Sequence, residues 1–218
     1  MMMDAAVRTF GRRGYRASSM DDIAEVAGVS KPLVYLYLNS KEDLFTACIR
    51  REAAALLAAV TAGARPGVSA DRQLRAGLGA FFAHTAENPD GWSVLHRRAR
   101  THGEPFAGEA AAMRDELVAV VTALIGAAAR EAVDGSVGGT ESGTDSGTDG
   151  GGDAGELADR DMAGLAQALV GAAESLADWA NETPGVSAKE AAATLMNFSW
   201  MGLGRLMAGE RWPTTPRR

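Results

Sequence analysis

The feature that most constrains the fold of this chain is the stretch Ser19–Lys41, whose apolar spacing predicts two short helices joined by a tight turn. Ala24 falls where the first helix meets the second, and a larger side chain there would push them apart. Gly28 falls in the turn, where a residue without a Cβ atom reaches a positive φ at little cost. Val34 points back into the small core. This spacing is typical of a DNA-reading helix-turn-helix, and an ordinary helical hairpin would less often combine it with the small residue and the glycine.

Serine residues stand where each of these helices is expected to begin. Ser19 and Asp22 match the pattern of a capping box. Ser30 precedes the second helix, and Pro32 falls in its first turn, where a missing N–H costs little. Ser40 precedes a third helix. The free N–H groups of these first turns also offer hydrogen bonds to phosphates.

The outer face of the second helix is expected to enter a major groove. Side chains on this face are expected to approach base edges: Lys31, Pro32, Leu33 and Tyr37. Residues that flank the face or stand at helix N-termini are expected to hold phosphates: Ser19, Ser30, Tyr35 and Lys41. The sequence therefore predicts double-stranded DNA as a partner.

The motifs of this region resemble those of the tetracycline-repressor (TetR) family of bacterial transcriptional regulators. The matching segments are Phe10–Tyr15, Ser18–Ser19, Ile23–Ala24, Ala27–Ser30, Tyr35–Tyr37 and Ser40–Leu44. They lie within residues 1–50, and beyond them the resemblance is only architectural. The resemblance implies an all-helical homodimer that binds a palindromic operator and releases it when a small molecule enters the C-terminal domain.

Two features depart from the usual pattern of that family. Leu33 and Leu36 are apolar where relatives often carry a small polar residue and an aromatic residue or histidine, which favours contact with thymine methyl groups over hydrogen-bonded base reading. The segment Met1–Asp4 already belongs to the first expected helix, whereas most relatives have a basic arm before it. The start is therefore expected to be truncated or misassigned, with phosphate contacts missing.

Length and composition agree with a helical protein of two domains. The chain has 218 residues, of which 46% are hydrophobic. We predict an all-α fold, with an N-terminal three-helix helix-turn-helix domain at residues 1–48 and a C-terminal ligand-binding and dimerisation domain at residues 49–218. Neither a signal peptide nor a membrane-spanning run is recognisable, which predicts a cytoplasmic protein without a membrane partner. The single cysteine, Cys48, is expected to be a small buried hydrophobe.

The net charge of −6 comes from one tract. Residues 1–52 carry eight basic and seven acidic residues, a balance of +1, whereas residues 53–218 carry 14 and 21, a balance of −7. Residues 134–157 hold six of these acids, no base and nine glycines. With almost no apolar surface to bury, this tract is expected to be a flexible loop. It faintly resembles a calcium loop but lacks the closing glutamate.

The rest of the chain is expected to form helices at residues 40–63, 70–88, 92–101, 105–133, 159–181 and 187–209. The last of them is apolar on two faces, so both faces must be covered. We therefore expect the last two helices to form half of a four-helix homodimer interface, through Leu165, Leu169, Ala172, Leu176, Gly202 and Leu206. The alternative is that these two helices are the core of a monomer.

Large apolar residues on several helices are candidates for lining an effector cavity: Trp92, Met113, Leu117, Trp179, Met196 and Phe198. The alternative for each is plain core packing. The run His96–His102 either meets an anionic ligand or forms a solvated basic face. The histidines of the chain lack partners at metal-ligand spacing, so neither a metal site nor a cofactor is expected.

These patterns predict a DNA-binding transcriptional regulator, a repressor released from a palindromic operator by a small lipophilic effector. An architectural DNA-binding protein without an effector is one alternative, although it would not need so large a helical core. A helical enzyme is the other alternative, although the sequence contains neither a Gly-x-Ser-x-Gly elbow nor a phosphate-binding glycine loop.

Overall fold

The computed structural model describes residues 1–37, 40–137 and 159–207, without the side chains of residues 36–37, 132–137, 159 and 200–207. Within these residues the chain is helical and has no strand, which confirms the predicted all-α class. The helices are α1 (Met2–Arg13), α2 (Met20–Ala27), α3 (Lys31–Tyr37), α4 (Lys41–Gly63), α5 (Ala70–Glu87), α6 (Pro89–Trp92), the π-helix η1 (Ser93–Ala99), α7 (Phe106–Val137), α8 (Asp159–Glu182) and α9 (Ala188–Met207).

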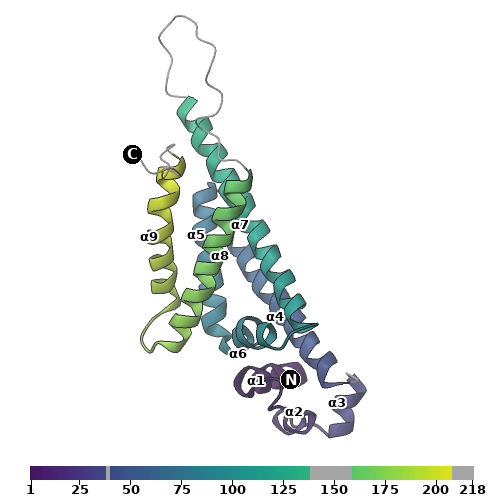
Figure 1. Ribbon diagram of the computed structural model, residues 1–218. Helices are drawn as coiled ribbons and strands as arrows, with labels where there is room; N and C mark the ends of the chain where they lie inside the picture. Colours follow the sequence, from purple (N-terminus) through teal and green to yellow (C-terminus); the bar gives the residue numbers. More distant parts are fainter. Residues whose placement is uncertain (38–39, 138–158, 208–218) are drawn as a thin grey trace, which may run out of the picture.

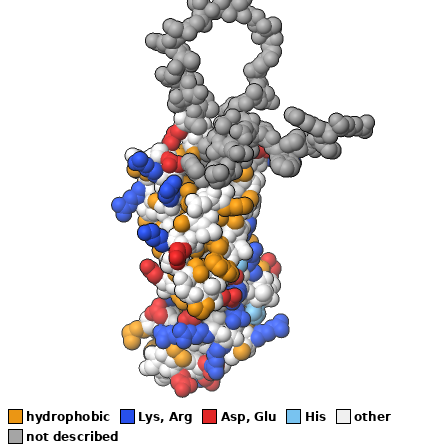
Figure 2. All heavy atoms as spheres, turned by 90° about the vertical axis from the view of Figure 1, so that its left-hand side faces the viewer, with side chains coloured by type: hydrophobic (Ala, Val, Ile, Leu, Met, Phe, Trp, Pro, Cys, Tyr) orange, Lys and Arg blue, Asp and Glu red, His pale blue; other side chains and the backbone are white. Residues whose placement is uncertain are grey.

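The helices form a small lobe at one end of an elongated bundle (Figure 1). The lobe contains α1, α2 and α3, and the bundle contains α5, α7, α8 and α9. Helix α4 belongs to both, because it packs against α1 in the lobe and against α5 and α7 in the bundle. We call residues 1–48 the head and residues 49–207 the body. Figure 2, which views the molecule from the α9 side, shows hydrophobic side chains along the middle of the body and basic side chains near the head.

Side-chain caps fix the helix starts in the head. The Ser19 hydroxyl accepts a hydrogen bond from the Asp22 backbone N–H (3.1 Å), and the Asp22 carboxylate accepts one from the Ser19 backbone N–H (2.9 Å). The Ser19 hydroxyl also donates to the Asp22 carboxylate at 2.6 Å, and the hydrogen bonds donated by the Ser19 hydroxyl and backbone N–H hold the pKa of Asp22 below its usual range. The Ser40 hydroxyl likewise accepts from the Asp43 backbone N–H at 3.0 Å. The caps predicted at Ser19 and Ser40 are therefore confirmed.

The core of the head consists of fully buried side chains from its four helices: Phe10, Ile23, Val34, Leu44 and Phe45. Gly28, at φ 66°, turns the chain between α2 and α3 in the left-handed conformation that brings Val34 to this core. Phe45 packs edge-on against Phe10 and against Phe106 of α7, with ring centroids 4.8 Å apart in each pair. The aromatic packing of the head therefore continues into the body.

Two helix boundaries differ from the predicted ones. The helix expected at residues 92–101 begins at Pro89 and changes from α6 to the π-helix η1, a geometry that apolar periodicity does not reveal. Helix α7 continues through Val137, into the tract expected as a loop, because each added residue gains a hydrogen bond and no proline stops the helix. The rest of that tract, including its resemblance to a calcium loop, lies outside the described residues.

Cys48 of α4 is fully buried in this core. Burial raises the pKa of its thiol to about 12, so the thiol is protonated at neutral pH. The prediction of a small buried core residue is confirmed. In the described part of the chain, no helix is both long and apolar enough to cross a membrane.

Candidate DNA-binding surface and effector cavities

The outer face of α3 is exposed at the far end of the head. Lys31 and Pro32 are exposed, and Leu33 and Tyr35 keep 37% and 43% of their surface accessible, whereas Val34 between them is fully buried. One short helix therefore presents several of the predicted DNA contacts on a surface open to solvent. The side chain of Tyr37 lies outside the described residues.

Two lysines predicted to contact DNA already have partners in the head. Lys31 Nζ lies 2.8 Å from Asp21 Oδ1, and this exposed ion pair raises the pKa of Lys31. Lys41 is half-buried, and its ammonium donates to the backbone oxygens of Tyr15 (3.1 Å) and Ser18 (3.0 Å). An ammonium has three N–H groups. Lys41 therefore ties α4 to the loop after α1 and retains one donor for a phosphate.

Other polar side chains of the head are also exposed. Ser19 and Ser30 are exposed; Ser19 caps α2, and the Ser30 carbonyl accepts from the Leu33 N–H at 3.0 Å. Arg16, for which no role was predicted, is exposed in the loop before α2 and has no ion-pair partner among the described residues. Its position just before the Ser18–Ser19 pair was the signal that could have identified it.

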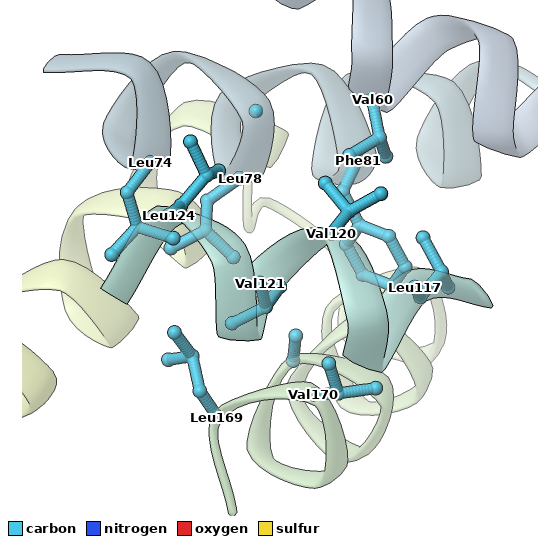
Figure 3. Close-up of a pocket in the computed structure, with 12 residues that line it drawn as sticks. Val60, Leu74, Leu78, Phe81, Leu117, Val120, Val121, Leu124, Leu169 and Val170 are labelled. Atoms are coloured by element: carbon cyan, nitrogen blue, oxygen red, sulfur yellow. The ribbon is translucent and has the colours of Figure 1, made fainter. Parts of the chain in front are cut away.

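An apolar cavity of about 30 Å³ lies between α4, α5, α7 and α8. Figure 3 shows its side chains pointing toward one another, among them Val60, Leu74, Phe81, Leu117, Val121 and Leu169. Leu117 was predicted to line an effector cavity, and the structure places it in this one. Pockets for drug-sized ligands occupy roughly 300 Å³ or more, so the apolar cavity is nearly closed in this conformation.

Leu169 was predicted in the dimer interface, and the structure corrects this assignment. Its side chain is only 5% exposed and lines the apolar cavity, because this face of α8 packs against α7. Leu165, Ala172 and Leu176 are half-buried against the same core. Gly202 and Leu206 belong to the part of α9 whose side chains are not described. An apolar stripe identifies a face of a helix but not the neighbour that covers it.

A second cavity, of about 210 Å³, lies between η1, α7 and α8, and we call it the polar cavity. Met113 of α7, another predicted effector contact, lines it beside His96, Arg100, Arg114 and Glu174. The Glu174 side chain is only 7% exposed, and its Oε2 atom lies 3.3 Å from Arg114 Nε and 3.5 Å from Arg100 Nη1. The basic run noted in the sequence is therefore paired with an acid on a distant helix.

Trp92 is buried behind the polar cavity and lines neither cavity. Its Nε1 donates to Asp178 Oδ1 (2.8 Å), and its ring stacks on His96 with centroids 4.8 Å apart. His96 Nδ1 lies 3.0 Å from Asp178 Oδ2 and carries the proton of this hydrogen bond, because a carboxylate only accepts. Met196 is also buried, at 7% exposure, and also lines neither cavity.

Trp179 and Phe198 were predicted to line the effector cavity, and this prediction is wrong for the single chain. They are 51% and 77% exposed, on α8 and α9 respectively. The physical reason is that α8 and α9 turn their other sides toward α7 and α5. Within the part of the chain that the structure describes, nothing covers the side chains of Trp179 and Phe198.

The head and the body meet through close backbone contact between α1 and the α6–η1 segment. A Cβ atom on Gly11 would lie 2.5 Å from the Asp90 carbonyl oxygen, so only glycine fits there. Ser93 Oγ donates to the Gly11 carbonyl at 3.0 Å, and Arg98 Nε to the same oxygen at 3.3 Å. Arg12 pairs with Asp90 at 3.1 Å. Consequently η1 holds the head on one side and lines the polar cavity on the other.

Comparisons with known proteins agree with this architecture. The family described as bacterial regulatory proteins, tetR family, matches residues 2–48. A TetR-like transcriptional regulator from Rhodococcus sp. RHA1 has a similar structure, with a TM-score of 0.73 and 32% sequence identity over 93% of each chain. The regulator FadR from Bacillus subtilis, in complex with stearoyl-CoA, aligns over 96% of this chain and 98% of its own with a TM-score of 0.64, but at 17% identity it shows the fold alone.

A curated relative matches over a shorter segment. The HTH-type transcriptional activator FasR from Mycolicibacterium smegmatis is 35% identical over 94 residues, which is 43% of each chain. The matched segment of this chain therefore spans less than half the length of that relative.

The fold and the exposed α3 define a helix-turn-helix protein with a helical body, whose described part contains the apolar and polar cavities. The match over the head, together with the likeness to the Rhodococcus regulator over nearly the whole chain, shows that the chain belongs to the TetR family of bacterial regulatory proteins. The resemblance seen in the sequence is confirmed.

Proposed function

We propose that this protein is a transcriptional repressor that binds an inverted-repeat operator as a homodimer and releases it when a small lipophilic effector enters the body. The observation that carries this proposal is the continuity of α4. This helix has Phe45 in the core of the head and Val60 in the wall of the apolar cavity. A change in the cavity is therefore transmitted to the reading helix along one rigid element.

The exposed face of α3 is the proposed reading surface. Its base contacts are Lys31, Pro32, Leu33 and Tyr37, and its phosphate contacts are Ser19, Ser30, Tyr35 and Lys41, with Arg16 added from its exposed position. To reach a base, Lys31 must leave Asp21. That exposed pair is worth little in water, so the exchange costs little.

The outer side of α8 and α9 is the proposed dimer interface. A two-fold dimer places two reading helices about 34 Å apart, or a multiple of this, to match an inverted repeat. Trp179 and Phe198 are the proposed anchors, because buried aromatic side chains dominate the binding energy of protein interfaces. The half-buried Leu165, Ala172 and Leu176 of α8 are proposed contacts beside them, and Gly202 and Leu206 remain proposed contacts from α9.

The apolar cavity, in an opened form, is the proposed site for the effector chain. A ligand changes a conformational equilibrium only through its differential affinity for the two states, and a hundredfold release from DNA needs about 2.7 kcal/mol of it. The nearly closed cavity supplies such a difference, since an effector fits only when α4, α5, α7 and α8 separate. The FadR complex with stearoyl-CoA supports an aliphatic chain as occupant.

The test is a gel-shift assay of the full chain on its own upstream DNA, repeated with a library of lipophilic compounds. At least one compound is expected to release the DNA from the wild type. Val121→Phe fills the apolar cavity and should keep DNA binding while losing release. Ala119→Phe, on the exposed side of the same helix, should behave as the wild type.

Other outcomes would contradict parts of the proposal. DNA binding that no compound affects would indicate an architectural role. A reporter gene that loses expression when the protein is removed would indicate activation, the role in the name of the FasR relative.

A further inference from the structure

We propose that the polar cavity is an anionic subsite of the effector site, which binds the carboxylate head of an amphiphile whose chain lies in the apolar cavity. This inference rests on the proposed effector function of the body. It identifies the effector as an amphiphile with a carboxylate head. It also gives a role to the polar cavity, which a purely lipophilic effector would not need.

The two cavities are neighbours along the same two helices. On α7, Met113 lines the polar cavity and Leu117 lines the apolar cavity. On α8, Glu174 lines the polar cavity and Val170 lines the apolar cavity. The two residues of each pair are four positions apart, slightly more than one helical turn and a rise of about 6 Å. A molecule with a polar head and an aliphatic chain can therefore occupy both cavities.

The charge of the polar cavity favours an anion. Its wall carries two fixed cations, Arg100 and Arg114, against one carboxylate, Glu174. Both guanidinium groups approach the same Glu174 oxygen, at 3.5 and 3.3 Å, and each guanidinium has five N–H donors, of which Arg114 gives one more to the Gln167 side chain. Asp178 binds Trp92 and His96 and lies 3.7 Å from Arg97, and the described residues show no ion pair between it and Arg100 or Arg114. A second carboxylate would therefore find donors that Glu174 and Gln167 leave unused.

The burial of these groups sets the direction of approach. The Glu174 side chain is 7% exposed, whereas those of Arg114 and Arg100 are 25% and 46% exposed. Glu174 therefore forms the inner wall, and the arginines lie closer to solvent. A ligand carboxylate can join them without displacing Glu174, so no buried charge is left unpaired.

The subsite is connected to the head by a route that does not involve α4. Arg100 directly follows η1, whose Ser93 and Arg98 hold the Gly11 carbonyl of α1. An anion that draws Arg100 into the cavity therefore pulls on the segment that positions the head. π-Helices are rare in proteins, but those that occur are frequently found at functional sites. The π-helical geometry of η1 agrees with this role. Carboxylates should consequently release DNA better than neutral amphiphiles of the same length.

Titration calorimetry of the full chain with decanoate, decanol and acetate tests the subsite. Decanoate is expected to bind at least tenfold more tightly than decanol, and acetate should bind no more than weakly. Arg114→Gln and the more exposed Arg100→Gln should each bring decanoate to the affinity of decanol. Arg97→Gln removes a charge next to the cavity, where Arg97 pairs with Glu182 and lies 3.7 Å from Asp178 but does not line the cavity, and should leave the preference unchanged. Glu174→Gln should increase decanoate affinity, an effect that a purely structural role of Glu174 would not produce.

The remaining outcomes separate the two proposals. Equal affinity of the wild type for decanoate and decanol would overturn the subsite and leave the apolar cavity as the effector site. Acetate binding as tight as that of decanoate would show an independent anion site, which also overturns the proposal. If neither decanoate nor decanol binds while the protein still shifts operator DNA, the subsite and the lipophilic effector both fail.

Discussion

The head and the α8–α9 pair are both helical, but different contacts hold them in place. In the head, Ser19 and Ser40 cap their helices, and Phe45 packs against aromatic rings on two sides. Among the described side chains of α8 and α9, the buried ones are aliphatic or small except for Glu174 and Met196, while Trp179 and Phe198 face solvent. The aromatic core of the head is thus closed within one chain, whereas α8 and α9 have an outer side that the described residues leave uncovered.

This difference separates stability from assembly. Substitutions inside the head should lower the free energy of unfolding. Substitutions on the outer side of α8 and α9 should change the oligomeric state and leave the fold of each chain intact. The predictions below test this separation.

The largest effect is expected for Phe45→Ala. The variant removes a fully buried ring from the centre of the aromatic cluster, which should lower the free energy of unfolding by about 3–5 kcal/mol. Denaturant unfolding followed by circular dichroism measures this loss. Tyr35→Ala, on the exposed face of the same head, is the control and should change stability by less than about 0.5 kcal/mol. Similar stability losses in both variants would contradict the conclusion that Phe45 lies in the core and Tyr35 on the surface.

Leu169 and Trp179 offer a matched pair on the two sides of α8. Leu169→Ala should lower the free energy of unfolding by about 2–5 kcal/mol, because Leu169 is 5% exposed in the core. Trp179→Ala should weaken dimerisation by about 2 kcal/mol or more. Sedimentation equilibrium and thermal unfolding at fixed protein concentration separate the two effects. A wild-type chain that is monomeric at micromolar concentration would refute the proposed dimer.

Two basic residues of the head should affect DNA binding in different ways. Lys31→Ala should relax sequence preference, with a cost of about 1–3 kcal/mol on the operator. Arg16→Ala should weaken binding to all sequences similarly and reduce the salt slope by about one unit. Binding isotherms on operator and scrambled DNA at several salt concentrations measure both. If neither variant changes affinity, the reading face has been assigned to the wrong surface.

The smallest effect is expected at the cap of α2. Ser19→Ala removes the hydroxyl that accepts from Asp22 and should cost about 1 kcal/mol. Because hydrogen bonds from Ser19 lower the pKa of Asp22, the ionised carboxylate stabilises the fold above the ordinary pKa of 3.8. That contribution is lost as the pH falls through the lower folded-state pKa. The difference in the free energy of unfolding between the wild type and Asp22→Asn should therefore decrease at acid pH. A difference that does not depend on pH would contradict a stabilising role of the ionised Asp22 carboxylate at the start of α2.

The sequence predicted the head down to single hydrogen bonds, because its signals act over a few residues. Ser19 caps α2 through Asp22, and Gly28 turns the chain, whatever the rest of the molecule does. The sides of α8 were harder to predict. Leu169 and Trp179 belong to the same apolar stripe, and only the packing of α7 against α8 decides which of them is covered.

The polar cavity was only partly predictable from the sequence. The basic run around Arg100 was recognised as either a ligand contact or a solvated face. The acid that pairs with it, Glu174, lies 74 residues away, so sequence spacing gave no means of pairing the two. The π-helix η1 contains His96 and directly precedes Arg100, both of which line this cavity. The sequence did not predict the π-helix, because its apolar pattern does not distinguish it from an α-helix.

The contact of Gly11 with the Asp90 carbonyl limits how regulators of this kind can be recombined. In a chimera that joins a foreign head to this body after residue 48, any residue other than glycine at the position of Gly11 would clash with the Asp90 backbone and keep the two parts separated. The Arg12–Asp90 pair would be broken by the same exchange. The unit that can be transferred is therefore the head together with α6, two separate segments of the chain that must be grafted together. In evolution, α1 can change near Gly11 only together with the backbone of α6 at Asp90.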